Sequence, residues 1–193
     1  MLDNNLLEKY KSVLRENLYE KRYNHSLCVA DEAVRLARLY GADEDKCYLA
    51  GLLHDVTKNL PEEDHLKIFE TFGIMLSAVE KNAEKLWHAI SGTAYIKNFL
   101  KIEDEDILDA VRYHTTGKAD MPLITKVLFL ADFTSADRDY DDVDVIRKLV
   151  DEDYNKAIIY ALKYTINELV EGSNPIHPDT IAAFNEALLK EGN

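Results

Sequence analysis

The chain has 193 residues, of which 47% are hydrophobic and 31% are charged, a composition typical of a globular protein that buries a sizeable core. Its 23 basic and 36 acidic side chains leave a net charge of −13, so we expect neither nucleic acid nor an anionic membrane as a partner. No apolar run approaches the ~20 residues that span a bilayer, and no secretory signal follows Met1, so we expect a cytoplasmic protein.

Hydrophobic residues recur at three- and four-residue spacing through almost the whole chain, which predicts an all-α protein. Pro61 and Pro178 suit first turns of helices, and Gly41, Gly73 and Gly172 suit their C-terminal ends. In chain order, the predicted helices span residues 5–20, 24–40 (with Asn24 as its cap), 43–57, 61–72, 78–86, 88–100, 104–115, 122–135, 142–151, 153–171 and 178–190.

The same pattern predicts the domain organisation. No internal repeat, low-complexity tract or long linker interrupts the helices. We therefore expect a single domain over residues 1–193, with its core motifs at about 20–140 and C-terminal helices at about 142–190 packing on them.

Two carboxylates lie in otherwise apolar helical segments. Asp55 follows His54 at the end of Leu49-Ala-Gly-Leu-Leu, and Asp132 ends the segment Val127-Leu-Phe-Leu-Ala. A carboxylate removed from water is tolerated only when it is paired, hydrogen-bonded, metal-bound or protonated. Both positions therefore predict a cation nearby.

Histidines complete the constellation, because neutral imidazole and carboxylate form the mixed ligand set that suits iron, manganese, zinc or nickel. A single histidine on an apolar face is more often a satisfied core residue than a ligand. Here an early His25, the pair His54-Asp55 that follows 29 residues later, and the late Asp132 occur together. The combination predicts a metal site held by His25, His54, Asp55 and Asp132.

The order of these residues resembles the signature of the HD-domain superfamily of metal-dependent phosphohydrolases, which are helical bundles. Further motifs, from about residue 10 to 190, resemble those of the YqeK-type symmetrical bis(5'-nucleosyl)-tetraphosphatases. These motifs are Arg22-Tyr-Asn-His-Ser-Leu-Cys-Val-Ala, Ala50-Gly-Leu-Leu-His-Asp-Val-Thr-Lys, Trp87-His-Ala-Ile-Ser-Gly, Tyr113-His-Thr-Thr-Gly, Ala131-Asp-Phe with Arg138, and Ile176-His-Pro-Asp-Thr-Ile-Ala-Ala-Phe-Asn.

The resemblance implies a single-domain helical bundle of the HD type that hydrolyses diadenosine tetraphosphate, a dinucleoside polyphosphate, to two molecules of ADP. It implies iron as the metal, with manganese or another divalent transition metal as the alternative, and it leaves a homodimer open. The matched metal ligands are His25, His54, Asp55 and Asp132, the expected catalytic residues are His54, Asp55, Lys58, His88 and His114, and the expected substrate contacts are His25, Asp55, Lys58, His88, His114, Thr115, Asp132 and Arg138.

One segment departs from the family pattern. After the late aspartate the resemblance leads us to expect Asp-Tyr-Ile-Glu-Pro-x-Arg, whereas this chain reads Asp132-Phe-Thr-Ser-Ala-Asp-Arg138. The arginine keeps its place, but the Glu and the Pro are absent. The shape of this loop is therefore left open.

The acidic run around Arg138 has two further interpretations. Asp137, Asp139 and Asp141 occupy alternate positions, as in a calcium loop, but position six is an aspartate rather than Gly and position twelve is Lys148 rather than Glu. We therefore predict a solvated acidic cluster. Arg138 either offers its planar fork to a phosphate or forms a surface salt bridge with this cluster.

Other charged residues also keep two interpretations. Lys58 reaches a phosphate oxygen or is a surface lysine near a helix end. His88 and His114 contact phosphates and protonate the leaving group, or they ligate a second metal. We expect His65 to be exposed, and His177 to line the nucleotide site or to cap the last helix.

A bound metal activates water and neutralises phosphate charge, so hydrolysis of a phosphoanhydride needs positioned cations more than a protein nucleophile. The sequence contains no Gly-rich phosphate loop, no HExxH and no GxSxG motif that would compete. Two alternatives stay open: an HD phosphohydrolase that acts on another nucleotide, and a non-catalytic nucleotide-binding sensor domain.

Overall fold

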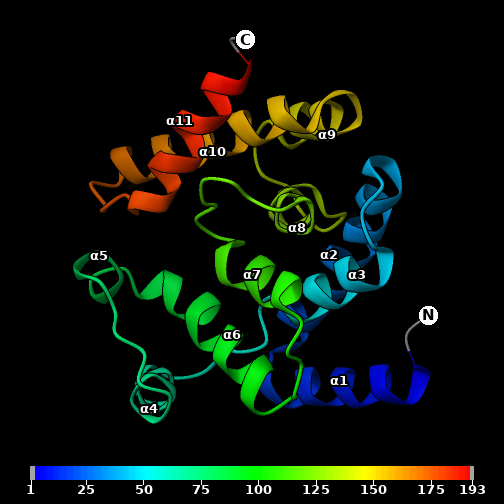
Figure 1. Ribbon diagram of the computed structural model, residues 1–193, viewed down its shortest axis with the longest axis vertical. Helices are drawn as coiled ribbons and strands as arrows, with labels where there is room; N and C mark the ends of the chain where they lie inside the picture. The colour runs from blue at the N-terminus through cyan, green and yellow to red at the C-terminus, as the bar shows by residue number, and fades with distance from the viewer. Residues whose placement is uncertain (1–2, 192–193) are drawn as a thin grey trace.

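A computed structural model describes residues 3–191 of the chain, and within these residues the secondary structure is entirely helical (Figure 1). The predicted all-α fold is therefore confirmed. Among residues 3–191, every helix is too short or too polar to span a bilayer. In chain order the elements are α1 (Asn4–Asn17), α2 (Glu20–Tyr40), α3 (Glu44–Leu53), α4 (Glu62–Thr71), α5 (Ala78–Lys81), the 3-10 helix η1 (Glu84–Leu86), α6 (Trp87–Asn98), α7 (Glu105–Tyr113), α8 (Leu123–Thr134), α9 (Val143–Glu152), α10 (Tyr154–Glu171) and α11 (Pro178–Glu191).

Four helices, α2, α3, α7 and α8, pack on one another at the centre of the molecule. Figure 1 shows α9, α10 and α11 on one side of α8, and α4, α5 and α6 together on the other side. One hydrophobic cluster extends from Tyr10 in α1 to Ala183 in α11, so the C-terminal helices share the core of the central helices. A second, smaller cluster of Phe69, Trp87 and Ile90 joins α4 to α6.

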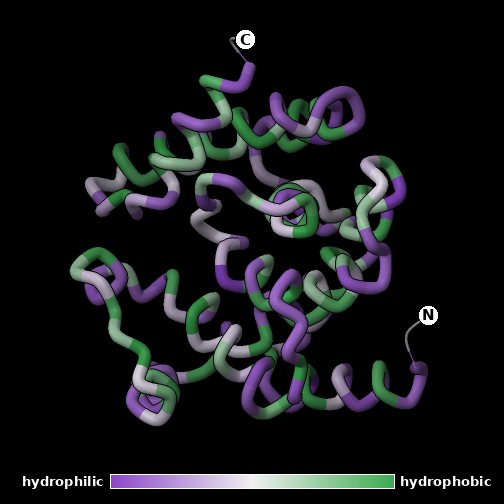
Figure 2. The backbone as a smooth tube through the Cα atoms, viewed as in Figure 1, coloured by the Kyte–Doolittle hydropathy of each residue, from purple (hydrophilic) through white to green (hydrophobic). Residues whose placement is uncertain are grey.

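The outer helices are amphipathic, as their sequence pattern predicts. In α9 the buried residues are Val143, Ile146 and Val150, which recur at three- and four-residue spacing on one face. Figure 2 shows short hydrophobic and hydrophilic stretches alternating along α1, α10 and α11. These helices therefore bury one face on the core and present the other to water.

Two predicted helix starts were wrong. Helix α2 begins at Glu20, four residues before the predicted cap Asn24. The backbone N–H of Tyr19, which has no partner within the helix, donates to the Asn59 side chain at 3.0 Å. Because this partner comes from a distant turn, the local sequence does not reveal it. Pro61 precedes α4 rather than lying in its first turn, whereas Pro178 opens α11 as predicted.

The predicted helix 78–86 is divided into α5 and η1. Ser77 and Glu80 form a reciprocal capping box at the start of α5. The indole N–H of Trp87 donates to the backbone carbonyl of Glu80 at 2.7 Å and so takes an acceptor that a continuing helix would use. The chain then leaves the helix at Asn82.

Helix α3 ends at Leu53, before the predicted end at residue 57. Its continuation is a series of tight turns, in which the Val56 N–H donates to the Leu53 carbonyl at 3.0 Å and the Lys58 N–H donates to the Asp55 carbonyl at 2.8 Å. His54 and Asp55 therefore lie on a turn at the end of a buried helix rather than inside it.

Helices α2 and α3 approach closely at Gly51, where a Cβ atom would lie 2.8 Å from the Ala30 Cα. We predict that Gly51→Ala destabilises the fold by about 3 kcal/mol, because two backbones must separate in a packed core. Gly73→Ala is the comparison: it meets no atom within 4 Å but forces φ +63° on alanine, at a cost of about 1 kcal/mol. Urea unfolding measures both. Equal losses in the two variants would contradict the close approach.

Candidate active site

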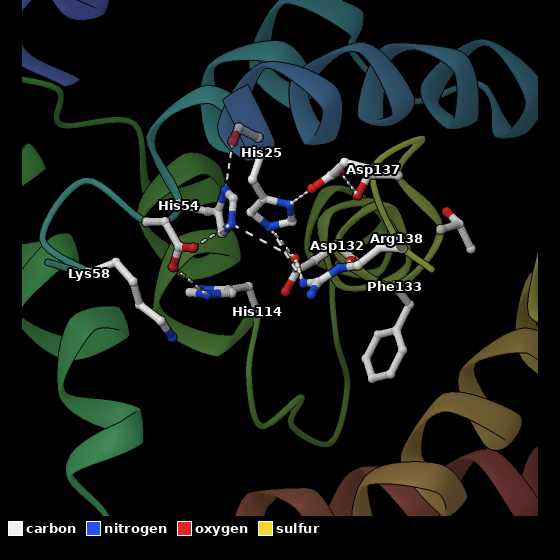
Figure 3. A network of polar contacts seen from close by, with 12 residues as sticks. His25, His54, Lys58, His114, Asp132, Phe133, Asp137 and Arg138 are labelled. Atoms are coloured by element: carbon white, nitrogen blue, oxygen red, sulfur yellow. Dashed lines mark hydrogen bonds and ion pairs between the residues drawn. The ribbon is translucent and has the colours of Figure 1, made fainter. Parts of the chain in front are cut away.

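The four predicted metal ligands come together from three elements, and Figure 3 shows three of them, His25, His54 and Asp132, pointing toward one another. His25 lies in the second turn of α2, His54 and Asp55 lie on the turn after α3, and Asp132 lies in the last turn of α8. His25 Nε2 is 2.9 Å from Asp132 Oδ1, and His54 Nε2 is 3.3 Å from Asp55 Oδ2 and 3.9 Å from Asp132 Oδ1. Residues that are far apart in the sequence thus form one cluster of nitrogen and oxygen donors.

This cluster fits a cation. His54 is fully buried and Asp55 is 2% exposed, yet His54 Nε2 and Asp55 Oδ1 have no hydrogen-bond partner among residues 3–191. Ligand atoms of His25, His54 and Asp55 lie within 4.8 Å of one another, as do those of His54, His114 and Asp132. Unpartnered buried donors of this mixed type suit a divalent transition metal.

The electrostatics favour positive charge at the same point. Burial opposes the ionisation of Asp55, but the adjacent His54 imidazole outweighs it and holds the pKa of this carboxyl well below its ordinary value. Burial likewise opposes the ionisation of Asp132, and Arg138 and His25 keep its pKa low. Two ionised carboxylates therefore meet in the interior.

Two of the histidines are oriented by helix ends. His54 Nδ1 lies 2.7 Å from the Gly51 carbonyl, and His114 Nδ1 lies 2.7 Å from the Val111 carbonyl. Both carbonyls are among those that a helix leaves free at its C-terminal end. Each bond keeps a ring proton on Nδ1 and turns Nε2 towards the cluster, where its lone pair is the one that a metal would use.

His88, His114 and Lys58 adjoin Asp55 on one side. His88 Nε2 is 3.2 Å from Asp55 Oδ1 and 3.1 Å from His114 Nε2, and Lys58 Nζ is 3.2 Å from both ring nitrogens of His88. Burial lowers the pKa of His88 well below its usual value and lowers the pKa of His114 to about 4, so both rings are neutral near pH 7. Lys58 is half-buried, which differs from the surface lysine of the alternative interpretation, and burial lowers its pKa as well.

Arg138 lies on the opposite side and pairs with Asp132, not with the exposed acidic run. Its Nη2 contacts Asp132 Oδ1, and its Nε donates to the Asp132 backbone carbonyl at 2.6 Å. The predicted acidic cluster is exposed, as expected, but one member also reaches the site, because the Asp137 carboxylate lies 2.8 Å from His25 Nδ1. This contact depends on the fold of the loop, so residue spacing alone did not indicate it.

A cavity of about 320 Å³ lies beside this cluster, between the residue 82–86 segment, the turn after α7, and helices α10 and α11. Thr115, which directly follows His114, lines the cavity, and its buried Oγ1 has no hydrogen-bond partner among the described residues. His177 lines the cavity and also accepts the Asp179 N–H at 3.2 Å. Both interpretations of His177 therefore fit its position.

Sequence reasoning missed a hydrogen-bonded chain behind His88. His65, expected to be exposed, is 7% exposed, and its Nδ1 lies 2.8 Å from Ser91 Oγ. Ser91 Oγ lies 2.9 Å from Thr57 Oγ1, which donates to the His88 backbone carbonyl at 2.9 Å. Thr57 and Ser91 belong to the motifs that begin at Ala50 and Trp87, and this membership was the available signal that they contribute to the site.

The sequence also gave no role to Arg22, which belongs to the first motif. Arg22 donates to Asp55 Oδ2 at 2.9 Å.

The HD domain family model matches residues 22–137, a range that contains all four predicted metal ligands. A protein of Halalkalibacterium halodurans named "Bis(5'-nucleosyl)-tetraphosphatase, symmetrical" is 36% identical over 95% of this chain and 97% of its own length. A Bacillus subtilis protein of the same name is 36% identical over 92% of this chain and 95% of its own length.

A solved structure indicates the same family. It is a predicted HD superfamily hydrolase involved in NAD metabolism from Clostridium acetobutylicum, and it superposes with a TM-score of 0.92 at 38% identity, over 95% of this chain and 97% of that one. The chain therefore belongs to the HD domain family, among the symmetrical bis(5'-nucleosyl)-tetraphosphatases. The family resemblance drawn from the motifs is confirmed.

The donor cluster leads to a prediction about metal binding. We expect Asp55→Asn to lower the affinity for Fe²⁺ or Mn²⁺ by more than about 100-fold, because loss of a ligand exceeds the effect of losing a supporting hydrogen bond. Chelator competition and metal analysis of anaerobically purified protein measure it. The control, Asp144→Asn, removes the same charge from an 85% exposed side chain. Equal metal content in the Asp55→Asn variant and the unaltered protein would exclude this site.

The chain behind His88 leads to a prediction about stability. We expect Ser91→Ala to lower the free energy of unfolding by about 1–3 kcal/mol, because it leaves the buried Nδ1 of His65 without its partner and removes one of the two partners of Thr57 Oγ1. The control, Thr93→Ala on the same helix, removes a hydroxyl that bonds its own helix at the Ala89 carbonyl, and we expect a change within about 0.5 kcal/mol. Urea unfolding of both variants decides, and an unchanged Ser91→Ala midpoint would count against the network.

Proposed function

We propose that this chain hydrolyses diadenosine tetraphosphate symmetrically to two molecules of ADP. The observation that carries the proposal is the match of relatives with that activity in their name over 92–95% of the chain, including all of the site. The buried donor cluster, with Lys58 and Arg138 on its two sides, supports a reaction on a polyanion.

The metal of the proposal is iron, with manganese or another divalent transition metal as the alternative, and His25, His54, Asp55 and Asp132 would hold it. The convergence of their ligand atoms supports this set. When bound, such a metal supplies Lewis acidity that neutralises phosphate charge and lowers the pKa of water.

In the same proposal, Lys58 and Arg138 bind phosphate oxygens. Each now contacts a group at the site, His88 and Asp132 respectively, and each can exchange that contact for a phosphate. A tetraphosphate bridge carries several negative charges, which two cations on opposite sides of a buried cluster would align. This arrangement holds the substrate without a Gly-rich loop.

His88 and His114 act as a proton path in this proposal. With its proton held on Nδ1 by the Val111 carbonyl, His114 accepts at Nε2 from His88 Nε2–H, and His88 Nδ1 accepts from Lys58. In this step His88 gives its Nε2 proton to the leaving phosphate instead of to His114 and takes one at Nδ1 from Lys58, whose ammonium has further N–H groups for a phosphate oxygen. Asp55, His88 and His114 also keep their ligand atoms within 4.8 Å of one another, so a second cation remains the alternative for these two histidines.

The cavity beside Thr115 would receive one nucleoside. Its volume of about 320 Å³ and its lining suit a base and ribose: Leu86, Leu169 and Pro175 are apolar, and Thr115 and Thr180 carry hydroxyls. The unpartnered Thr115 Oγ1 is the donor that such a ligand would use. Its position directly after His114 supports a nucleoside subsite next to the proposed phosphate contacts.

We also propose that residues 1–193 form one HD domain and that the protein is cytoplasmic. The single hydrophobic cluster that joins Tyr10 to Ala183 supports the domain assignment. The net charge of −13 supports a freely diffusing protein that binds a small anion at a local cluster of cations. The proposal keeps a homodimer as the alternative to a monomer.

A product assay tests the function. Purified protein loaded anaerobically with Fe²⁺ or Mn²⁺ should convert diadenosine tetraphosphate to ADP alone, as resolved by ion-exchange chromatography. Formation of AMP and ATP would overturn the symmetrical reaction. Turnover of a different nucleotide with none of this substrate would favour the other HD phosphohydrolase, and binding without turnover would favour the sensor domain.

Lys58 tests the role of the site within that reaction. We expect Lys58→Met to lower kcat by about 100-fold, because the variant loses both a positioned charge and a proton donor. The control, Lys67→Met, removes an exposed lysine of α4 that pairs only with Asp64 among the described residues. It should retain full activity. A Lys58→Met enzyme as active as the control would remove Lys58 from the mechanism.

A further inference from the structure

The loop that departs from the family pattern, residues 134–138, has a defined shape. Arg147 of α9 holds it by donating to three backbone carbonyls: those of Thr134 at 3.2 Å, Ser135 at 2.9 Å and Arg138 at 3.0 Å. The Arg138 N–H also donates to the Ser135 carbonyl at 3.0 Å, which closes a tight turn. The loop is therefore fixed without the Glu and the Pro.

Within this loop both oxygens of the Asp137 carboxylate have partners. Oδ1 accepts the Ser135 hydroxyl at 2.8 Å, and Oδ2 lies 2.8 Å from His25 Nδ1. Figure 3 shows His25 between Asp137 and Asp132, which lie at its two ring nitrogens. The Asp137 side chain is 34% exposed, whereas that of His25 is 4% exposed, so the contact reaches from the surface into the site.

His25 needs this partner because of its place in the fold. His54 and His114 follow helix ends and use the free carbonyls three residues earlier. His25 lies inside α2, which continues to Tyr40, so the nearby carbonyls are already engaged in the helix. An acceptor for its Nδ1 must therefore come from another element.

We propose that Asp137 is a positioning residue for His25: its carboxylate keeps the ring proton on Nδ1 and directs the lone pair of Nε2 to the metal centre. A carboxylate in this position fixes the orientation of a ligating imidazole and increases its basicity. Ser135 and Arg147 in turn fix the carboxylate. The inference rests on the proposed function only through the metal centre, and it requires no particular substrate.

Metal affinity is the first test. Asp137→Ala should lower the affinity for Mn²⁺, measured by chelator competition in the absence of substrate, by 10–100-fold, with a smaller loss for Asp137→Asn, whose amide oxygen still accepts a hydrogen bond. Asp139→Asn is the matched control, because it removes one charge from an exposed neighbour in the same run, and its affinity should stay within about twofold. Equal losses in the two asparagine variants would reduce the effect to net charge and overturn the inference.

The tautomer of His25 is the second test, and it uses metal-free protein. Because Nε2 faces Asp132 when no metal is bound, the readout is Nδ1. Nitrogen chemical shifts of the ¹⁵N-labelled ring should report a proton on Nδ1 in the unaltered protein and its loss in Asp137→Ala, where only Nε2 keeps a carboxylate partner. An unchanged tautomer would overturn the inference even in a chain that binds no metal. If the metal affinity and the tautomer respond as expected but diadenosine tetraphosphate is not cleaved, the proposed function fails while the role of Asp137 stands.

Discussion

The buried Asp55 carboxylate is the constraint on which the rest of the structure depends. It is 2% exposed and lies where the turn after α3 meets α2, α6 and α7. An ionised carboxylate in such a place costs several kcal/mol unless positive or hydrogen-donating groups surround it. Arg22, His54 and His88 approach it from separate elements, and its Oδ1 still lacks a hydrogen bond. The helices are thus arranged around a buried carboxylate whose surroundings fit a cation.

The ends of the helices give this centre its geometry. A helix leaves carbonyl groups free at its C-terminal end, and His54 and His114 use them to fix their protons and to turn their lone pairs inward. His25 lies inside a helix and depends on the 134–138 loop instead. The same loop carries Arg138 to Asp132. The histidines of the site are therefore oriented by two carbonyl groups that helix ends leave free, and by the 134–138 loop, which supplies the acceptor that the interior of α2 cannot provide.

The sequence predicted the helices well, because the spacing of apolar residues is a local property that packing reinforces. It also predicted which residues would gather, since Asp55 and Asp132 stand out as carboxylates in apolar segments. Its errors share one cause. Asn24 resembles a cap, His65 resembles an exposed histidine beside acidic neighbours, and Asp137 resembles a solvated aspartate. In each case a partner distant in the sequence decides: the Tyr19 N–H at the start of α2 donates to the Asn59 side chain, His65 contacts Ser91, and Asp137 contacts His25.

By itself, the sequence determined the all-α class, the order of the helices and which four residues, His25, His54, Asp55 and Asp132, would gather in the interior, because hydrophobic periodicity and carboxylates in apolar segments are local properties of a sequence. The family motifs added the expected substrate contacts. Only the tertiary structure decided which nitrogen of each histidine faces the centre, that α3 stops at Leu53 so that His54 and Asp55 lie on a turn, and that Asp137 contacts His25. The His54 bond to Gly51 spans three residues but requires α3 to end there, and the contact between His25 and Asp137 joins residues that are 112 positions apart. Local spacing carries no information about which distant groups a fold will bring together.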